Sequence, residues 1–142
     1  MQIEKYLPQR PPVLLIHEVL AFEQDGIVCS VDWKKLSFFQ DEMGRLIPSV
    51  MPEMITQASA IMNGLNQEGT AGPPGLGMFT ALKEFCILGL PIEEAPLRVT
   101  VKVDAVLGPH QIVEGRISQG DALLAHGLIF LYNKTESERK SE

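Results

Sequence analysis

SVMPEMITQASAIMNGLNQ, residues 49–67, is the only segment of this chain with a clear helical period. Its apolar side chains recur three or four residues apart and form one stripe: Met54, Ala58, Ile61 and Leu65. Small residues cover much of the remaining surface: Ala58, Ser59, Ala60 and Gly64. Ser49 is a suitable N-cap, and Pro52 is tolerated in the first turn, where its missing N–H is not needed. A helix that is apolar or small on most sides is usually buried, so we expect a sheet to wrap around it.

Strand-like segments lie on both sides of this helix. Before it, residues 13–22 are rich in aliphatic and β-branched side chains, Asp25-Gly26 is a hairpin turn, and residues 27–33 alternate as the returning strand. The glycines and prolines of GTAGPPG, residues 69–75, end the helix. Four further strands separated by turn residues follow, over 76–88, 97–107, 111–118 and 122–132. This order predicts an α+β fold in which an antiparallel sheet curls round one long central helix.

Two segments have no period of their own. Residues 34–48 predict a long loop, and the entirely polar residues 134–142 predict a disordered tail. We therefore expect a single domain over residues 1–133. Pairing two such sheets edge to edge removes an exposed strand edge, so we also expect a homodimer or a higher oligomer.

The composition argues against several classes of protein. The 142 residues are 45% hydrophobic and 21% charged, which is usual for a globular domain and too apolar for a disordered one. A net charge of −6 argues against nucleic acid as a partner. No apolar run reaches the roughly 18 residues that a membrane helix needs, and Glu4 and Lys5 interrupt the first residues, where a secretory signal would be apolar. We expect a cytoplasmic protein that contacts neither nucleic acid nor membrane.

Cysteine and histidine are too sparse to predict a metal site. Cys29 and Cys86 lie far apart without CxxC spacing, and their apolar neighbours predict two small core residues. His17 and His126 fall within apolar strands, where a core or edge histidine is expected, whereas His110 follows a Gly-Pro turn and is expected to be exposed. The sequence therefore predicts no disulfide framework, no metal and no cofactor.

Glu53 and Gln57 form the polar interruption of the central helix, one turn apart on the same face. The helix dipole stabilises a carboxylate in the first turn of a buried helix, while burial opposes its charge. Such opposed effects are typical of a general acid or base. The alternative is structural: Glu53 complements the dipole, and backbone groups satisfy Gln57.

Four motifs, in the same order along the chain, resemble those of 3-hydroxyacyl-acyl-carrier-protein dehydratases of the FabA/FabZ kind. LPQRPPVLLIHEVLAF, residues 7–22, is similar to their opening, which reads LPHR, a short gap and LLIDRV. FFQ, residues 38–40, resembles FFQGHFPG, and PEMITQASA, residues 52–60, resembles the helix motif E-A-M-A-Q-A. KEFCILGLPIEEAPLRVTV, residues 83–101, resembles KFRRPVxPGDxLxLxV. The resemblance implies the hotdog fold.

The resemblance also implies a reaction. In this family a loop histidine removes the α-proton of a 3-hydroxyacyl thioester, and an acidic residue on the helix of the other subunit assists loss of the hydroxyl. The helix N-terminus polarises the thioester carbonyl. Glu53 matches the catalytic acid and Gln57 the following helix glutamine, for which we expect substrate binding. Four apolar residues would line an acyl tunnel by the same resemblance, or pack in the core: Phe38, Phe39, Met78 and Phe79.

The loop histidine of the family is missing here. After FFQ the family reads Gly-His-Phe-Pro-Gly, whereas residues 41–45 read Asp-Glu-Met-Gly-Arg. No histidine lies between His17 and His110. Asp41 and Glu42 stand where the base would be, so they either replace it or are solvated loop charges.

Three functions are consistent with this departure. The first, which we expect, is a divergent dehydratase-like branch associated with aryl-polyene and similar pigment pathways. Such a protein acts on acyl-carrier-protein thioesters in fatty-acid or polyketide-type biosynthesis, with other residues or as one partner of a heterodimer. The second is a hotdog thioesterase that uses Glu53 alone on an acyl-carrier-protein or CoA thioester. The third is an acyl-binding subunit without catalysis.

Overall fold

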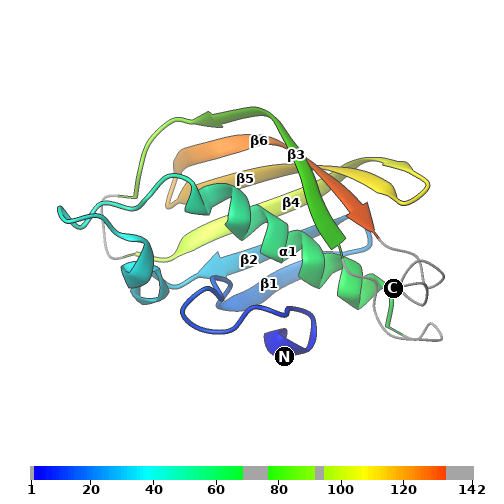
Figure 1. The fold of residues 1–142 in the computed structure, drawn as a ribbon, viewed down its shortest axis with the longest axis horizontal. Coiled ribbons are helices and arrows are strands. Elements are labelled where there is room, and N and C mark those ends of the chain that lie inside the picture. The colour runs from blue at the N-terminus through cyan, green and yellow to red at the C-terminus, as the bar shows by residue number, and fades with distance from the viewer. Residues whose placement is uncertain (1, 69–76, 92–94, 134–142) are drawn as a thin grey trace.

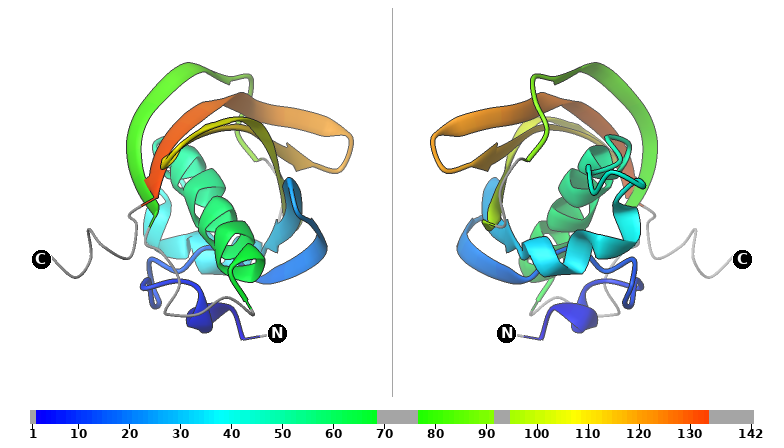
Figure 2. Two further views of the ribbon diagram at one scale, coloured as in Figure 1. Left: turned by 90° about the vertical axis from the view of Figure 1, so that its right-hand side faces the viewer. Right: turned by 90° about the vertical axis from the view of Figure 1, so that its left-hand side faces the viewer.

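The computed structural model describes residues 2–68, 77–91 and 95–133, in which one antiparallel sheet curves round one long helix (Figure 1). The sheet has six strands in the order β1-β2-β4-β5-β6-β3. Their bounds are β1 Glu18–Glu23, β2 Gly26–Val31, β3 Gly77–Ile87, β4 Leu97–Leu107, β5 His110–Gln119 and β6 Ala122–Asn133. The helix α1 spans Val50–Asn66, and the sheet arches around it in Figure 2. This is the predicted α+β hotdog arrangement.

The helix is buried, as its sequence predicts. The residues of the predicted stripe line the core: Met54, Ala58, Ile61 and, partly buried, Leu65. The sheet approaches α1 closely at Gly115 of β5, where a Cβ atom would lie 2.5 Å from Cδ1 of Ile55. Helix and sheet together close one hydrophobic core.

The four strands after α1 begin and end within one residue of the predicted ones. Their boundaries follow from turn chemistry, since Gly108 and Gly120 adopt φ values of 59° and 58°, a conformation that favours glycine. Side chains alternate along β4: Val99 and Val101 are buried, and Lys102 beside them is exposed.

The strand predicted over residues 13–22 begins only at Glu18. The Gln57 side chain takes the hydrogen bonds that a neighbouring strand would otherwise take. The backbone N–H of Leu15 donates to its Oε1 at 2.9 Å, and its Nε2 donates to the carbonyl of Val13 at 2.8 Å. The backbone of residues 13–15 is therefore bound to the helix instead of a strand, and the first hydrogen bond to β2 comes from the His17 N–H, which donates to the Ser30 carbonyl at 2.8 Å.

The loop predicted over residues 34–48 is partly helical. A 3₁₀ helix, η2, spans Trp33–Phe39, and Asp32 caps it by accepting a hydrogen bond from the backbone N–H of Lys34 at 3.0 Å. A shorter one, η1, spans Ile3–Lys5. Ser49 stands at the N-cap of α1, but its side chain makes no capping hydrogen bond.

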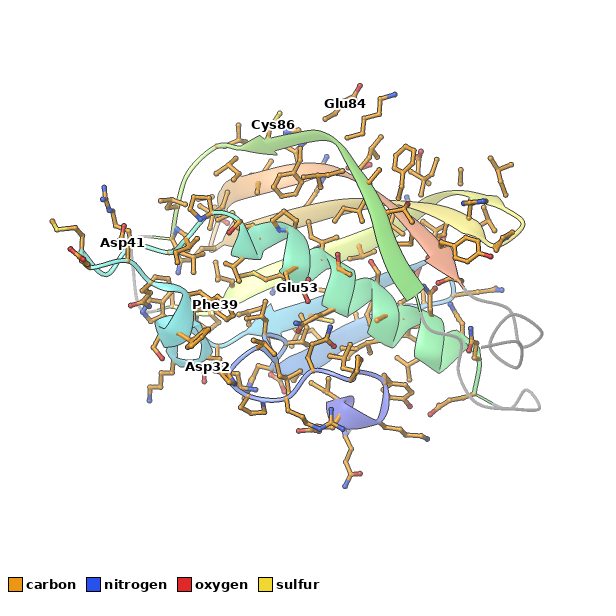
Figure 3. All side chains as sticks on the ribbon, viewed as in Figure 1. Asp32, Phe39, Asp41, Glu53, Glu84 and Cys86 are labelled. Atoms are coloured by element: carbon orange, nitrogen blue, oxygen red, sulfur yellow. The ribbon has the colours of Figure 1, made fainter. Side chains whose placement is uncertain are left out.

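Strand β3 is the last strand of the described sheet and pairs there with β6 alone. Its register shifts between Lys83 and Cys86, and Glu84 has a positive φ of 53°. Figure 3 places Glu84 at the bend of this strand. Cys86 is exposed, which corrects the prediction of a core cysteine. Neighbouring side chains alternate along a strand, and Phe85 takes the inward position.

No helix in the described ranges is long and apolar enough to cross a bilayer. The predicted polar tail, residues 134–142, lies outside the described residues. The domain boundary after residue 133 therefore stays a prediction.

Candidate active site

Glu53 lies in the first turn of α1, half-buried beside the segment that precedes β1 (Figure 3). Two side-chain amides donate to one of its oxygens: Gln57 Nε2 lies 3.1 Å from Oε1, and Gln9 Nε2 lies 3.4 Å from it. Glu53 forms no ion pair with any residue that the structure describes. Neutral donors therefore orient the carboxyl group from one side.

The second oxygen of Glu53 has a different environment. Within the described ranges, no hydrogen-bond donor lies on Oε2. A proton on Oε1 would face two N–H groups, so the proton of the acid form belongs on Oε2. Oε2 is therefore the atom through which Glu53 can give or take a proton.

Gln57 is almost completely buried, with 1% of its surface exposed. Its Oε1 accepts the N–H of Leu15, and its Nε2 donates to the Val13 carbonyl and to Glu53. Both amide hydrogens are thus used within the chain, as the structural alternative for Gln57 expects. Contact between Gln57 and a substrate stays a prediction, and what the structure gives is a hydrogen bond from Gln57 to Glu53.

Gln9 is the site residue that the sequence reasoning missed. It is the third residue of LPQR, and 44 positions separate it from Glu53, a spacing that indicates no contact. The path of the chain over α1 brings the two side chains together. The Oε1 atom of Gln9 is buried, and no residue that the structure describes donates a hydrogen bond to it.

Asp41 does not lie at this site, since Figure 3 places it at the loop tip, well away from Glu53. Its Oδ1 accepts the backbone N–H groups of Met43 at 2.8 Å and Arg45 at 3.0 Å, and its Oδ2 accepts Arg45 Nε at 3.1 Å. These donors, chiefly the Arg45 backbone N–H, lower the pKa of Asp41. Glu42 beside it is exposed. Asp41 thus closes a solvated loop. This agrees with the prediction of a solvated loop charge and not with that of a replacement base.

The predicted acyl tunnel is described only in part. Phe38 and Phe39 contact each other edge to face, with ring centroids 5.1 Å apart. Phe38 is 63% exposed, while Phe39 packs against the core. The side chains of Met78 and Phe79 lie outside the part of the chain that the structure describes. A tunnel lined by all four residues stays a prediction.

The N-terminus of α1 offers fewer free donors than the resemblance implies. The N–H of Val50 donates to the Ile47 carbonyl and that of Met51 to the Pro48 carbonyl, both at 3.1 Å. Pro52 has no N–H. The helix dipole still favours negative charge at this end. A thioester carbonyl would need a donor other than these three residues.

Neither cysteine is placed to replace the missing histidine. Burial raises the pKa of Cys29 to about 12, so it is a thiol at neutral pH, and Cys86 is exposed on β3. His17 is exposed just before β1 and is not a core residue. His110 is exposed, as predicted, and His126 is half-buried on β6.

Solved proteins of low sequence identity share this fold. The chain is similar to the dehydratase heterocomplex ApeI:P from Xenorhabdus doucetiae, with 20% identity, a TM-score of 0.87, and coverage of 99% of this chain and 96% of that chain. It is similar to a hypothetical thioesterase with coenzyme A from Streptococcus pneumoniae, with 8% identity, a TM-score of 0.66, and coverage of 82% and 84%. A Streptococcus mutans protein bound to acetyl CoA gives 8% identity, a TM-score of 0.65, and coverage of 82% and 87%. At these identities the likeness shows the fold alone.

No curated protein sequence matches this chain significantly. A family model described as ApeP-like, ApeP dehydratase, matches residues 1–141. This match confirms the predicted resemblance to dehydratases over almost the whole length. The chain therefore belongs to the ApeP-like dehydratase family of hotdog proteins.

Proposed function

We propose that this protein dehydrates 3-hydroxyacyl thioesters and that Glu53 transfers the proton to the leaving hydroxyl. The asymmetry of the Glu53 carboxyl group carries the proposal: two amides hold Oε1, and Oε2 has no donor within the described chain. A half-buried carboxyl group fixed in this way can give a proton to a substrate oxygen in one defined orientation. Membership of the dehydratase family supports the reaction class.

The reaction breaks the Cα–H and C3–O bonds and forms a carbon–carbon double bond. A base takes the α-proton, and the electron pair of that bond forms the double bond. Oε2 of Glu53 protonates the departing hydroxyl, which leaves as water. Negative charge develops on the thioester carbonyl oxygen, and the N-terminal end of α1 favours charge of that sign.

This chain supplies the acid, and we place the base on another subunit. No histidine of the described residues is hydrogen-bonded to Glu53, and Asp41 is engaged in its own loop. A second hotdog subunit that carries the loop histidine would complete the site. The similar Xenorhabdus structure is named as a heterocomplex, which supports an assembly of two different subunits.

The surface of the chain supports such a partner. Strand β3 has a free edge within the described sheet, and free edges are common places of subunit pairing. Large apolar side chains are exposed on β3, just after it, and on the segment before α1: Phe38, Met43, Ile47, Leu82, Ile87 and Leu88. A second subunit paired with this edge would cover apolar side chains of β3. A homodimer through the same edge is the alternative assembly.

We further propose acyl carrier protein as the carrier of the thioester, in fatty-acid or polyketide-type biosynthesis in the cytoplasm. The four motifs that resemble acyl-carrier-protein dehydratases support this carrier. CoA is the alternative carrier, because two proteins of similar fold hold coenzyme A or acetyl CoA.

A thioesterase is the second candidate, since a lone carboxyl group such as Glu53 is sufficient for hydrolysis. In that reaction Glu53 would activate water or attack the thioester carbonyl itself. The C–S bond would break, and free acid and thiol would be released.

One incubation distinguishes the two candidates. The protein, with any subunit that co-purifies with it, is incubated with a 3-hydroxyacyl-pantetheine thioester, and the products are identified by mass spectrometry. We expect the enoyl thioester, which has lost one water. Free acid would establish the thioesterase instead, and an unchanged substrate would contradict both enzymes and leave an acyl-binding role.

A further inference from the structure

Gln9 is held firmly beside Glu53. Arg10 holds the backbone around Gln9 in place. The Nη1 atom of Arg10 donates to the Leu7 carbonyl at 2.6 Å and to the Gln9 carbonyl at 2.8 Å. Its Nη2 donates to the Glu4 carbonyl at 3.3 Å. The Gln9 amide therefore reaches α1 from a fixed backbone, and its Nε2 lies 3.4 Å from Glu53 Oε1.

The buried amide oxygen of Gln9 lowers the stability of the fold. Its Oε1 is buried and accepts no hydrogen bond from any residue in the described ranges. A buried carbonyl without a partner has lost its hydrogen bonds to water and gained none in return, which lowers stability. Methionine has nearly the same length and no such oxygen, so it would fill the same space without this cost. Stability alone does not account for glutamine here.

We infer that Gln9 is a positioning residue for Glu53, an inference that rests on the dehydratase function proposed above. Gln9 and Gln57 approach Oε1 from two segments of the chain, the N-terminal segment and α1 itself. Two donors on one oxygen fix the rotation of the carboxyl group, whereas one donor leaves it free to turn. Gln9 thereby keeps Oε2 as the oxygen that carries the proton to the substrate.

The test replaces Gln9 with methionine and measures stability and kinetics together. We expect Gln9→Met to lower kcat about 10- to 100-fold, the range for a misplaced catalytic group. KM should change less than about twofold, because the amide acts through Glu53 and not on the substrate. The melting temperature should stay the same or rise, since the unpaired oxygen is gone. Gln9→His, which can keep an N–H donor, should recover part of kcat.

The matched control is Gln2→Met, the same change at an exposed position of the same segment, where the side chain makes no cap hydrogen bond. It should leave kcat and the melting temperature unchanged. Unchanged kcat in Gln9→Met with a lower melting temperature would overturn the inference, because it would show a purely structural glutamine.

A crystal structure of Gln9→Met tests the positioning role of Gln9 without an activity assay. We expect the Glu53 carboxyl group to turn about its last bond or to occupy two orientations. If the Glu53 carboxyl group keeps its native orientation in the variant, the positioning role of Gln9 is wrong. If the native protein dehydrates no substrate, the proposed function fails, and the carboxyl orientation still decides the role of Gln9.

Discussion

Replacing Glu53 with glutamine is expected to reduce enoyl formation by about 100- to 10,000-fold, the usual contribution of a general acid or base. Glutamine keeps the length of the side chain and an oxygen that can accept the Gln57 and Gln9 amides. It has no proton to give to the leaving hydroxyl. The loss should therefore fall on kcat, with little change in KM or melting temperature.

Two further variants make this test specific to Glu53. Glu42→Gln removes an exposed carboxylate of the neighbouring loop and should leave the rate unchanged. Glu53→Asp keeps the acid but moves it away from the amide donors, and we expect an intermediate rate. If Glu53→Gln forms the enoyl product at the native rate, Glu53 is not the proton donor.

Gly115→Val is expected to destabilise the fold by about 3 kcal/mol, the upper part of the range for overpacked cores. A Cβ atom at this position would lie 2.5 Å from both Cδ1 and Cγ2 of Ile55 and 2.8 Å from its Cγ1. Ile55 is fully buried, so it has no free space into which to turn. Urea unfolding followed by circular dichroism measures the change in the free energy of unfolding.

A double-mutant cycle tests whether this contact causes the loss. Ile55→Ala shortens the opposing side chain, so Gly115→Val should cost less in that background by about 1 kcal/mol or more, a typical coupling between touching residues. Gly44→Ala is a comparison at a glycine with no described atom within 4 Å of its Cβ position, where the φ of +77° opposes the change. Additive effects of Gly115→Val and Ile55→Ala would contradict the packing argument.

The parts of the fold that follow from local chemistry could be predicted from the sequence. The helix and the four strands after it have a strong period and turn residues at both ends, so their bounds lie close to those observed. The burial of Met54 and Ile61 likewise follows from the width of the apolar stripe.

The parts that depend on distant contacts could not be predicted. The strand before Glu18 is lost because Gln57, from α1, bonds its backbone. Gln9 reaches Glu53 only through the path of the folded chain. Cys86 is exposed because Phe85 faces inward at a bulge. In each case a tertiary contact replaced the local preference.

Of the residues at the candidate site, the sequence singles out Glu53 and Gln57 but gives no sign of Gln9. Glu53 could be singled out because a carboxylate in an otherwise apolar helix is unusual. The loop gave no equivalent signal, since Asp41 is bonded within its own loop and Glu42 is exposed. Which group takes the α-proton therefore depends on what faces Glu53 in the assembled protein.

We propose that this chain gives the acid and that a second subunit gives the base. The most direct test compares the rate of enoyl formation by the purified chain alone with the rate by its complex with a histidine-bearing hotdog subunit that co-purifies with it. We predict that the chain alone is slower by about 100-fold or more, because it lacks a base. Equal rates would contradict the account and place both groups within copies of this chain.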